Sequence, residues 1–352
     1  MLSHYRYLIA LLGFAVHFSI FITRMNLYIA IIDMADLPQF NWTERDQSLM
    51  MSSYFYGYTV LMAFSGSLVA WIGAKRLVVG GTVLAGLATC IFPWVVKYSF
   101  TVGFILRLLT GVLHAPIMAA EQEILIPWSP HNEYSRLYFV QVSGALIGNF
   151  ACFAIGGSFI DHFGWEKLFI YGGLFSSVTG LVYYFLVEER PENCRWATHV
   201  ETAFIVENRL NFNPKSPKSK IPYRALLTSI PMWSVNSSFF TFSLIHAFFT
   251  NIFSKYLMDN FSLTVAMIGL LTSLPTLGEF FAYLVSAFVA DHYITKGMST
   301  TTVRKVISTI AQFVPGAICL LMTQTTNLPV IIFMSTLVLR YVVKTNFCDT
   351  KW

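Results

Sequence analysis

The stretch LYFVQVSGALIGNFACFAIGGSFI, residues 137–160, contains no Asp, Glu, Lys or Arg. It is long enough to cross a bilayer once as an α-helix, because a spanning helix needs about 20 mostly apolar residues. Its four glycines, Gly144, Gly148, Gly156 and Gly157, are small residues that permit close packing between membrane helices. The stretch therefore predicts a packed transmembrane helix.

The composition of the whole chain indicates a membrane protein. Of the 352 residues, 55% are hydrophobic and only 12% are charged, and the mean hydropathy is +0.60. A soluble chain carries about 25% charged residues. The 23 basic residues are dispersed among the loops rather than gathered in a stripe, and the five cysteines form no CxxC motif or even framework. We therefore expect no enzyme, no nucleic-acid partner, no metal site and no cofactor.

Segments with few charged residues give the number of spans. Six are free of charge and two carry internal charges, while a longer apolar segment is divided by a polar cluster followed by Pro329. The expected spans cover residues 7–23, 47–74, 77–96, 101–126, 137–160, 168–187, 225–254 and 263–290 and the two halves of 306–339. The sequence thus predicts an all-α membrane protein with ten spanning helices.

The loops suggest an orientation and a domain division. Most Lys and Arg residues fall in the loops that are cytoplasmic if the N-terminus is inside, which agrees with the positive-inside rule. The first external loop carries the glycosylation sequence Asn41-Trp42-Thr43, which marks Asn41 as a candidate. The longest loop is charged and rich in proline. The expected domains are a six-helix bundle (1–187), a cytoplasmic linker (188–222) and an incomplete helix bundle (223–352).

Several short motifs together resemble one family. GSLVAWIGAKR (66–76) is similar to the GxLADxxGxK signature of the major facilitator superfamily. RMNLYIAIIDM (24–34), SYFYGY (53–58), RLLTG (107–111) and STTTVRK (299–305) narrow the resemblance to the anion:cation symporter family. That family includes sialin, the vesicular glutamate transporters and the sodium-dependent phosphate cotransporters. The resemblance covers about residues 5–338 and implies a major facilitator fold of six helices followed by about four.

The resemblance also implies gate residues and shows departures from the family. It assigns the cytoplasmic gate to a set of glycines and charged residues, namely Gly66, Gly73, Lys75, Arg76, Asp291 and Arg304. Ala70 replaces the acidic residue of the signature. His114 stands where transporting members carry a glutamate, seven residues after Arg107. Family members continue into two more helices where this chain stops, so it resembles a truncated isoform.

Charged residues within the spans predict a binding site. A charge at the bilayer centre costs at least about 2.5 kcal/mol, so such residues normally face a partner or a cavity. Arg24 and Arg107 are expected at the same depth, on the order of 10–12 Å below the outer surface. Two guanidiniums there could bind a carboxylate or phosphate. Tyr58 and Asn26 are further candidate substrate contacts; for Arg24, extension towards the headgroups is the alternative.

Helical spacing adds candidates for ion coupling. Seven residues make nearly two turns, so Arg107, His114 and Glu121 are expected on one face, as are His17 and Arg24. His114, Glu121 and Glu279 are the coupling candidates. The alternatives are a neutral hydrogen-bonded histidine for His114, a solvated helix end for Glu121 and an ordinary bundle partner for Glu279.

These features predict a secondary active transporter of organic or inorganic anions, such as carboxylates or phosphate. It would work by alternating access coupled to protons or sodium. The expected form is a monomeric, multi-pass protein of the plasma membrane or of a lysosomal or vesicular membrane, with a small anionic substrate. The alternative is a truncated, non-transporting membrane protein or regulatory isoform.

Overall fold

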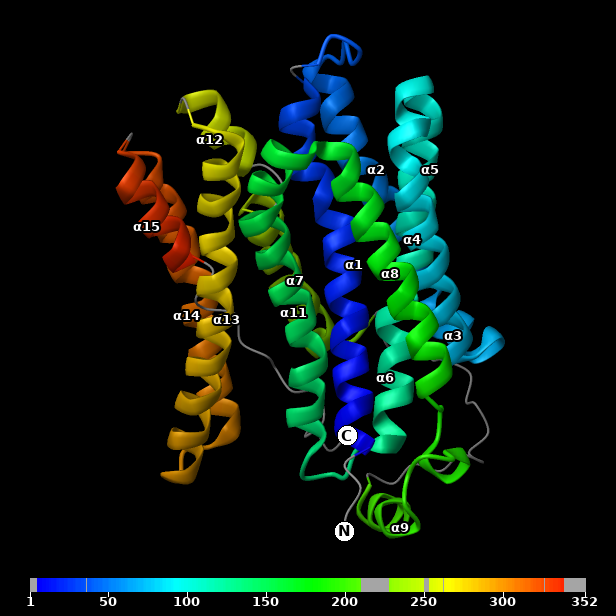
Figure 1. Ribbon diagram of the computed structural model, residues 1–352. Helices are drawn as coiled ribbons and strands as arrows, with labels where there is room; N and C mark the ends of the chain where they lie inside the picture. Colours follow the sequence, from blue (N-terminus) through cyan, green and yellow to red (C-terminus); the bar gives the residue numbers. More distant parts are fainter. Residues whose placement is uncertain are drawn as a thin grey trace. The chain divides into compact units, whose positions relative to one another are not determined.

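A computed structural model of the chain describes residues 5–35, 37–209, 228–249, 253–261, 263–325 and 327–338. The chain divides into two compact units, Met1–Lys215 and Ser216–Trp352. The point of division lies within the predicted linker. Nearly all of the described residues are helical, and the two units are described separately (Figure 1).

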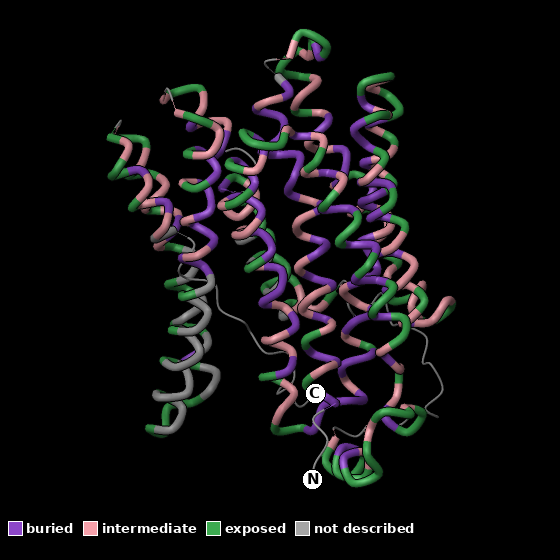
Figure 2. Tube along the Cα trace, viewed as in Figure 1, coloured by how far each residue is buried: buried purple, intermediate pink, exposed green. Residues whose placement is uncertain are grey.

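The first unit is a bundle of long helices. Its elements are α1 (Tyr5–Ala35), α2 (Glu44–Met62), α3 (Ser65–Ile72), α4 (Ala74–Tyr98), α5 (Phe100–His114), α6 (Ile117–Trp128), α7 (Tyr134–Phe163), α8 (Trp165–Leu186), the 3₁₀ turn η1 (Pro191–Asn193) and α9 (His199–Asn208). Helix α1 packs along α7 and α8, α4 packs on α8 and α5, and α2 packs on α5. Buried residues recur along the whole length of α1 (Figure 2). Helix α1 is thus a central element of the unit.

Two glycines explain the close contact between α1 and α7. A Cβ at Gly148 would lie 2.7 Å from the carbonyl oxygen of Phe18, and a Cβ at Gly144 would collide with the backbone of Phe14. The prediction of close helix packing is confirmed at these two positions. At Gly156 the nearest side-chain atom, from Ile29, would lie 3.4 Å away, which is ordinary contact.

The predicted spans of the first unit lie where the structure has helices, but the prediction misses places where a helix is interrupted within a span. Within the described residues, five helices are long and apolar enough to cross a membrane, and α2 with α3 makes a sixth although the two are bent by 66°. The predicted single helix over 47–74 is therefore wrong. The predicted span over 101–126 is confirmed, because Phe100–Trp128 counts as one of the five; a turn next to Pro116, which has no N–H to continue the helical hydrogen bonds, separates α5 from α6 within it.

The described part of the predicted linker is folded onto the first unit rather than being a free loop. The carboxylate of Glu201, in α9, accepts hydrogen bonds from the backbone N–H groups of Tyr5 (3.1 Å) and Arg6 (3.3 Å). It therefore satisfies N–H groups that the first turn of α1 would leave unpaired. The Arg6 guanidinium also forms ion pairs with Glu201 (3.2 Å) and Glu133 (2.7 Å).

The second unit contains α11 (Ile230–Ala247), α12 (Phe253–Asn260), α13 (Val265–Thr295), α14 (Thr300–Met322) and α15 (Leu328–Val338). Helix α13 packs against α15 and α14, and a Cβ at Gly278 would lie 2.5 Å from the carbonyl oxygen of Thr336. The segment predicted as one span over 225–254 is helical from Ile230 to Ala247, and a short helix follows. The polar cluster before Pro329 separates α14 from α15, as predicted.

Candidate functional site

Arg107, on α5, is buried and uses its guanidinium to hold α1. Its Nη1 donates to the carbonyl oxygen of Thr23 (3.0 Å) and its Nη2 to that of Arg24 (2.9 Å). A longer contact joins Nη1 to Oδ1 of Asn26 (3.5 Å). The side chain is only 2% exposed. Arg107 therefore gives two carbonyl groups in the middle of the continuous helix α1 a second hydrogen-bond donor, in addition to the N–H groups of the helix itself.

Arg24, on α1, has a different environment. Its guanidinium carbon lies 4.7 Å from the ring centre of Phe55, 5.2 Å from that of Phe21 and 5.5 Å from that of Tyr54. The side chain is half-buried, and its guanidinium makes no hydrogen bond or ion pair with any residue that the structure describes. The charge is thus surrounded by aromatic faces, which attract cations, while its N–H donors stay available.

The two arginines lie around one tyrosine. The guanidinium carbon of Arg107 is 5.9 Å from the Tyr54 ring, compared with 5.5 Å for that of Arg24. The Tyr54 hydroxyl pairs with Nδ1 of His114 (3.1 Å), and Nε2 of His114 is buried without a partner among the described residues. Tyr58 stacks on Tyr54 and its hydroxyl contacts the sulfur of Met118 (3.8 Å). A further positive charge on His114 would be repelled by both guanidiniums.

Asn26 and Tyr28 complete this cluster on α1. Asn26 is fully buried, and its Nδ2 has no partner in the described part of the chain. The Tyr28 hydroxyl donates to the carbonyl oxygen of Met51, on α2 (3.0 Å). Of the four predicted substrate contacts, Arg24 and Tyr58 are half-buried and Arg107 and Asn26 are buried.

A second polar cluster surrounds Glu121, on α6. Glu121 is 1% exposed, whereas Glu123 is exposed. Oε2 of Glu121 lies 3.6 Å from Nδ1 of His17 and accepts a hydrogen bond from Nε2 of Gln141. The alternative of a solvated helix end for Glu121 is therefore wrong. His114 and Glu121 also have different partners, since His114 pairs with Tyr54 and Glu121 with His17 and Gln141.

The partners of Glu121 were only partly visible in the sequence. Helical spacing places His17 on the same face of α1 as Arg24, but its proximity to Glu121 depends on how α1 and α6 pack. Gln141, on α7, and Tyr183, on α8, were not predicted. The available signal was a glutamine inside an otherwise apolar span.

Of the residues assigned to the cytoplasmic gate, some have a special conformation or specific contacts and others are exposed. Gly73 has φ of +99°, a conformation that glycine tolerates and other residues rarely adopt. The backbone N–H of Lys75 donates to Glu189 (3.0 Å) and its ammonium to Glu188 (3.2 Å). Arg76 is exposed, and a Cβ at Gly66 would meet no atom within 4 Å. Among the described residues, therefore, no other helix approaches Gly66 closely.

The remaining candidates lie in the second unit and in the segment between α1 and α2. Glu279 is buried, and its Oε2 lies 3.5 Å from Nδ1 of His246. The side chains of Asp291 and Arg304 lie outside the described residues. Asn41 is exposed just before Thr43, which caps α2 together with Asp46.

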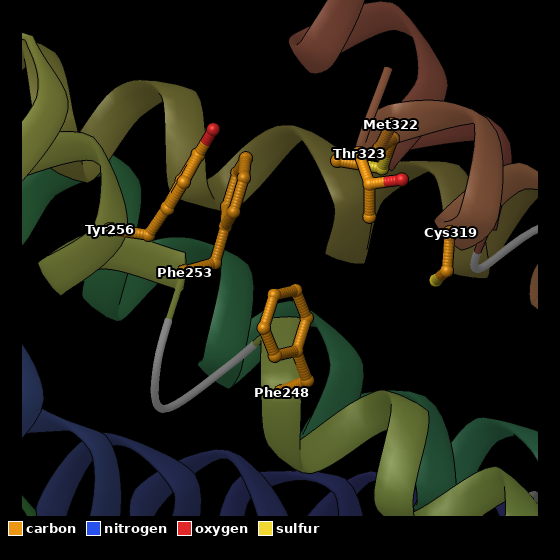
Figure 3. A pocket seen from close by; sticks show the side chains of 6 residues that line it. All are labelled: Phe248, Phe253, Tyr256, Cys319, Met322 and Thr323. Atoms are coloured by element: carbon orange, nitrogen blue, oxygen red, sulfur yellow. The ribbon is translucent and has the colours of Figure 1, made fainter. Parts of the chain in front are cut away.

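The second unit also contains an apolar pocket of about 330 Å³. It is lined by residues of α12 and of the ends of α11 and α14, namely Phe248, Phe253, Tyr256, Cys319, Met322 and Thr323 (Figure 3). The rings of Phe253 and Tyr256 are stacked, with their centres 6.2 Å apart. None of the described residues that line this pocket is charged, so it differs in chemistry from the arginine cluster of the first unit.

The helices and the two polar clusters define a multi-pass membrane protein with charged groups inside its helices. The chain belongs to the Major Facilitator Superfamily, whose sequence profile matches residues 12–343. It is similar to the Sodium-dependent phosphate transport protein 1 of Mus musculus, with 25% identity over 288 residues, which are 82% of this chain and 62% of that protein. It is also similar to Homo sapiens Sialin, with 24% identity over 340 residues, 88% of this chain and 68% of that protein.

A plant relative extends the comparison. The chloroplastic Ascorbate transporter of Arabidopsis thaliana is 27% identical over 316 residues, which are 88% of this chain and 57% of that protein. The chain therefore spans 57% to 68% of the length of these relatives. They include the sialin and phosphate transport proteins whose group the sequence motifs resemble, and that prediction is confirmed.

Solved structures confirm the fold. A bacterial homologue of the human lysosomal transporter Spinster, in an inward-facing and unoccupied conformation, matches with a TM-score of 0.66 at 12% identity, over 97% of this chain and 73% of that one. A D-xylose-proton symporter matches with a TM-score of 0.62 at 14% identity, over 95% of this chain and 79% of that one. The predicted all-α major facilitator fold is thus correct.

Proposed function

We propose that this chain acts as a secondary active transporter of organic anions, with Arg24 as the group that binds the anion. The observation that carries the proposal is the different use of the two arginines. Arg107 donates to two backbone carbonyl groups, whereas the guanidinium of Arg24 has no hydrogen-bond or ionic partner in the described residues. Charges inside membrane helices are costly and usually serve a function.

The chemistry of Arg24 suits a carboxylate. Its guanidinium presents parallel N–H donors that match the two oxygens of a carboxylate. The rings of Phe21, Tyr54 and Phe55 pack against the guanidinium and restrict its movement. The side chain therefore loses less conformational entropy when an anion binds. Arg107 contributes to this site by positioning α1, since one of its bonds is to the carbonyl oxygen of Arg24 itself.

The surroundings favour an organic anion over inorganic phosphate. Both Nη atoms of Arg107 are bonded to backbone carbonyl groups and only its buried Nε lacks a partner among the described residues, whereas the whole guanidinium of Arg24 lacks one and is surrounded by aromatic rings. Phosphate is a mixture of monoanion and dianion near neutral pH and has no apolar part, so it would gain most from several free cationic donors. An organic carboxylate carries one charge and a body that can contact aromatic rings. The relatives are named for phosphate and ascorbate transport among other activities, so both classes of anion need testing.

Uptake into proteoliposomes tests the proposal. Purified chain would be reconstituted and offered radiolabelled N-acetylneuraminate, ascorbate and phosphate in turn. We expect uptake of at least one organic anion, and Arg24→Ala should reduce it by at least about tenfold, which corresponds to 1.4 kcal/mol. Arg45→Ala, which removes an exposed arginine of α2, is the matched control and should retain uptake. Equal uptake by Arg24→Ala and wild type would reject the site, and no uptake of any probe by wild type would reject the transporter.

A further inference from the structure

We propose that the His17–Glu121 pair is the site where a coupling proton binds, so that transport by this chain is driven by protons. The inference rests on the proposed function and names its driving ion. It concerns a second cluster of the first unit, separate from the aromatic site around Arg24.

The pair has the geometry of an isolated buried ionisable site. His17 is 3% exposed and Glu121 is 1% exposed, and Nδ1 of His17 lies 3.6 Å from Oε2 of Glu121. His17 also contacts the carbonyl oxygen of Gly13 through Nδ1 (2.9 Å), which fixes the ring against α1. The absence of a side chain at Gly13 gives the carboxylate room, because a Cβ there would lie 2.6 Å from Oε2 of Glu121.

The hydrogen bonds around Glu121 leave a place for one proton. Oε2 accepts from Nε2 of Gln141, but Oε1 of Glu121 and Oε1 of Gln141 are both buried without partners in the described residues. Both orphan atoms are acceptors. A carboxylic acid beside a primary amide supplies the missing donor, and acid and amide have complementary sets of donors and acceptors. Protonation of Glu121 therefore relieves an unsatisfied acceptor in the low-dielectric interior.

The charges that face Glu121 are few. From α1 the titratable group is His17, from α8 it is Tyr183, and α7 contributes the neutral Gln141. No Lys or Arg forms an ion pair with Glu121 among the described residues. One proton shared by the pair makes it neutral overall, and its release leaves one uncompensated negative charge.

The negative charge of Glu121 lies beside His17, and helix α1 connects His17 to the anion site at Arg24. His17 and Arg24 are seven residues apart on the same helix, which is roughly 10 Å at 1.5 Å per residue. A unit negative charge at that distance, at an effective dielectric constant of 20, lowers the affinity of Arg24 for an anion on the order of tenfold. Protonation of the pair removes that charge, so proton and anion each favour the binding of the other, as symport requires.

An infrared titration tests the proton site without any transported substrate. Wild-type protein in lipid nanodiscs would be titrated from about pH 4 to 8, a window around the ordinary values of Glu and His. We expect a carbonyl band of a buried protonated carboxylic acid to titrate in wild type and Glu123→Gln and to be absent from Glu121→Gln. Glu121→Gln is nearly isosteric, and His17→Gln is a second variant, in which the band should persist but move along the pH axis. A band unchanged in Glu121→Gln would overturn the proposal.

Uptake under an imposed pH gradient tests the coupling. The probe is the organic anion that wild type transports best among N-acetylneuraminate and ascorbate. An acidic outside should accelerate uptake in wild type and in Glu123→Gln, whereas Glu121→Gln should retain uptake but lose the acceleration. Full acceleration in Glu121→Gln overturns the inference. If no anion is transported, the proposed function fails, and the infrared result still decides whether the pair binds a proton.

Discussion

The unequal roles of the two arginines lead to a prediction about folding. Arg107→Ala should destabilise the first unit strongly, whereas Arg24→Ala should affect stability little although it should weaken anion uptake by at least about tenfold. The reason is that Arg107 bonds to backbone carbonyl groups and Arg24 does not.

The magnitude follows from the hydrogen bonds that each substitution removes. Arg107 donates to the carbonyl oxygens of Thr23 and Arg24 at 3.0 and 2.9 Å, and each bond from a charged donor contributes about 1.5–3 kcal/mol. Removing the costly buried charge offsets part of this sum, so we expect a net loss of about 3 kcal/mol. Arg24→Ala removes only contacts to aromatic rings, each worth about 0.5–1 kcal/mol. It also removes a partly buried charge that has no ionic partner in the described part of the chain, which offsets part of this loss. Its net change should be below about 1 kcal/mol.

Unfolding in mixed micelles, followed by the fluorescence of the eight tryptophans, measures the difference. About 2 kcal/mol between the two variants corresponds to roughly thirtyfold in the unfolding equilibrium. Arg107→Lys should fall between wild type and Arg107→Ala, because an ammonium keeps the charge but has no fork of donors. The reasoning would be refuted if Arg24→Ala cost as much stability as Arg107→Ala.

Two further predictions concern packing and pH. Gly111→Ala should destabilise the first unit by about 1–3 kcal/mol, because the new Cβ would collide with the backbone of Tyr54. Gly80→Ala, where a Cβ meets nothing within 4 Å, should gain up to about 1 kcal/mol of helix propensity; the same unfolding titration compares them, and equal effects would contradict the packing argument. The hydrogen bond from the Arg6 guanidinium holds the pKa of Glu133 below its usual value. This stabilisation is complete above about pH 4.3 and is lost as the pH falls through the lowered pKa, so the unfolding midpoints of wild type and Glu133→Gln should differ near neutral pH and converge in acid; parallel curves would contradict it.

The positions of the spans were predictable because the cost of placing charge in lipid acts locally. The charge-free stretch over residues 137–160 lies within α7, and Gly144 and Gly148 contact α1 as their small size suggested. The bend between α2 and α3 was not predicted, because the apolar run continues through it. The contact of α9 with the start of α1 was also missed, because it depends on pairings nearly 200 residues apart in the sequence.

The candidate site was predictable as a set of residues but not as an arrangement. Arg24 and Arg107 are equivalent by depth and residue type, and only the folded chain shows that one of them binds carbonyl oxygens. Backbone acceptors have no signature in the sequence, so this difference could not be inferred. The His17–Glu121 pair was similarly hidden, because helical spacing gives the face of each helix and not which faces meet.

Helix α1 links the charged groups of the first unit. Glu201 binds its first turn, Glu121 faces His17 in its middle, and Arg107 holds the carbonyl groups of Thr23 and Arg24. Because α1 is one continuous helix, a change in its contact with Glu201, Glu121 or Arg107 alters the position or the electrostatic environment of Arg24, the residue that we propose as the anion ligand. The local conformation of Arg24 therefore depends on α5 and its electrostatic environment on α6. A substitution of Arg107 should then reduce anion affinity even in molecules that remain folded, whereas a substitution of Glu121 should change the pH dependence of that affinity and leave its value in acid unchanged.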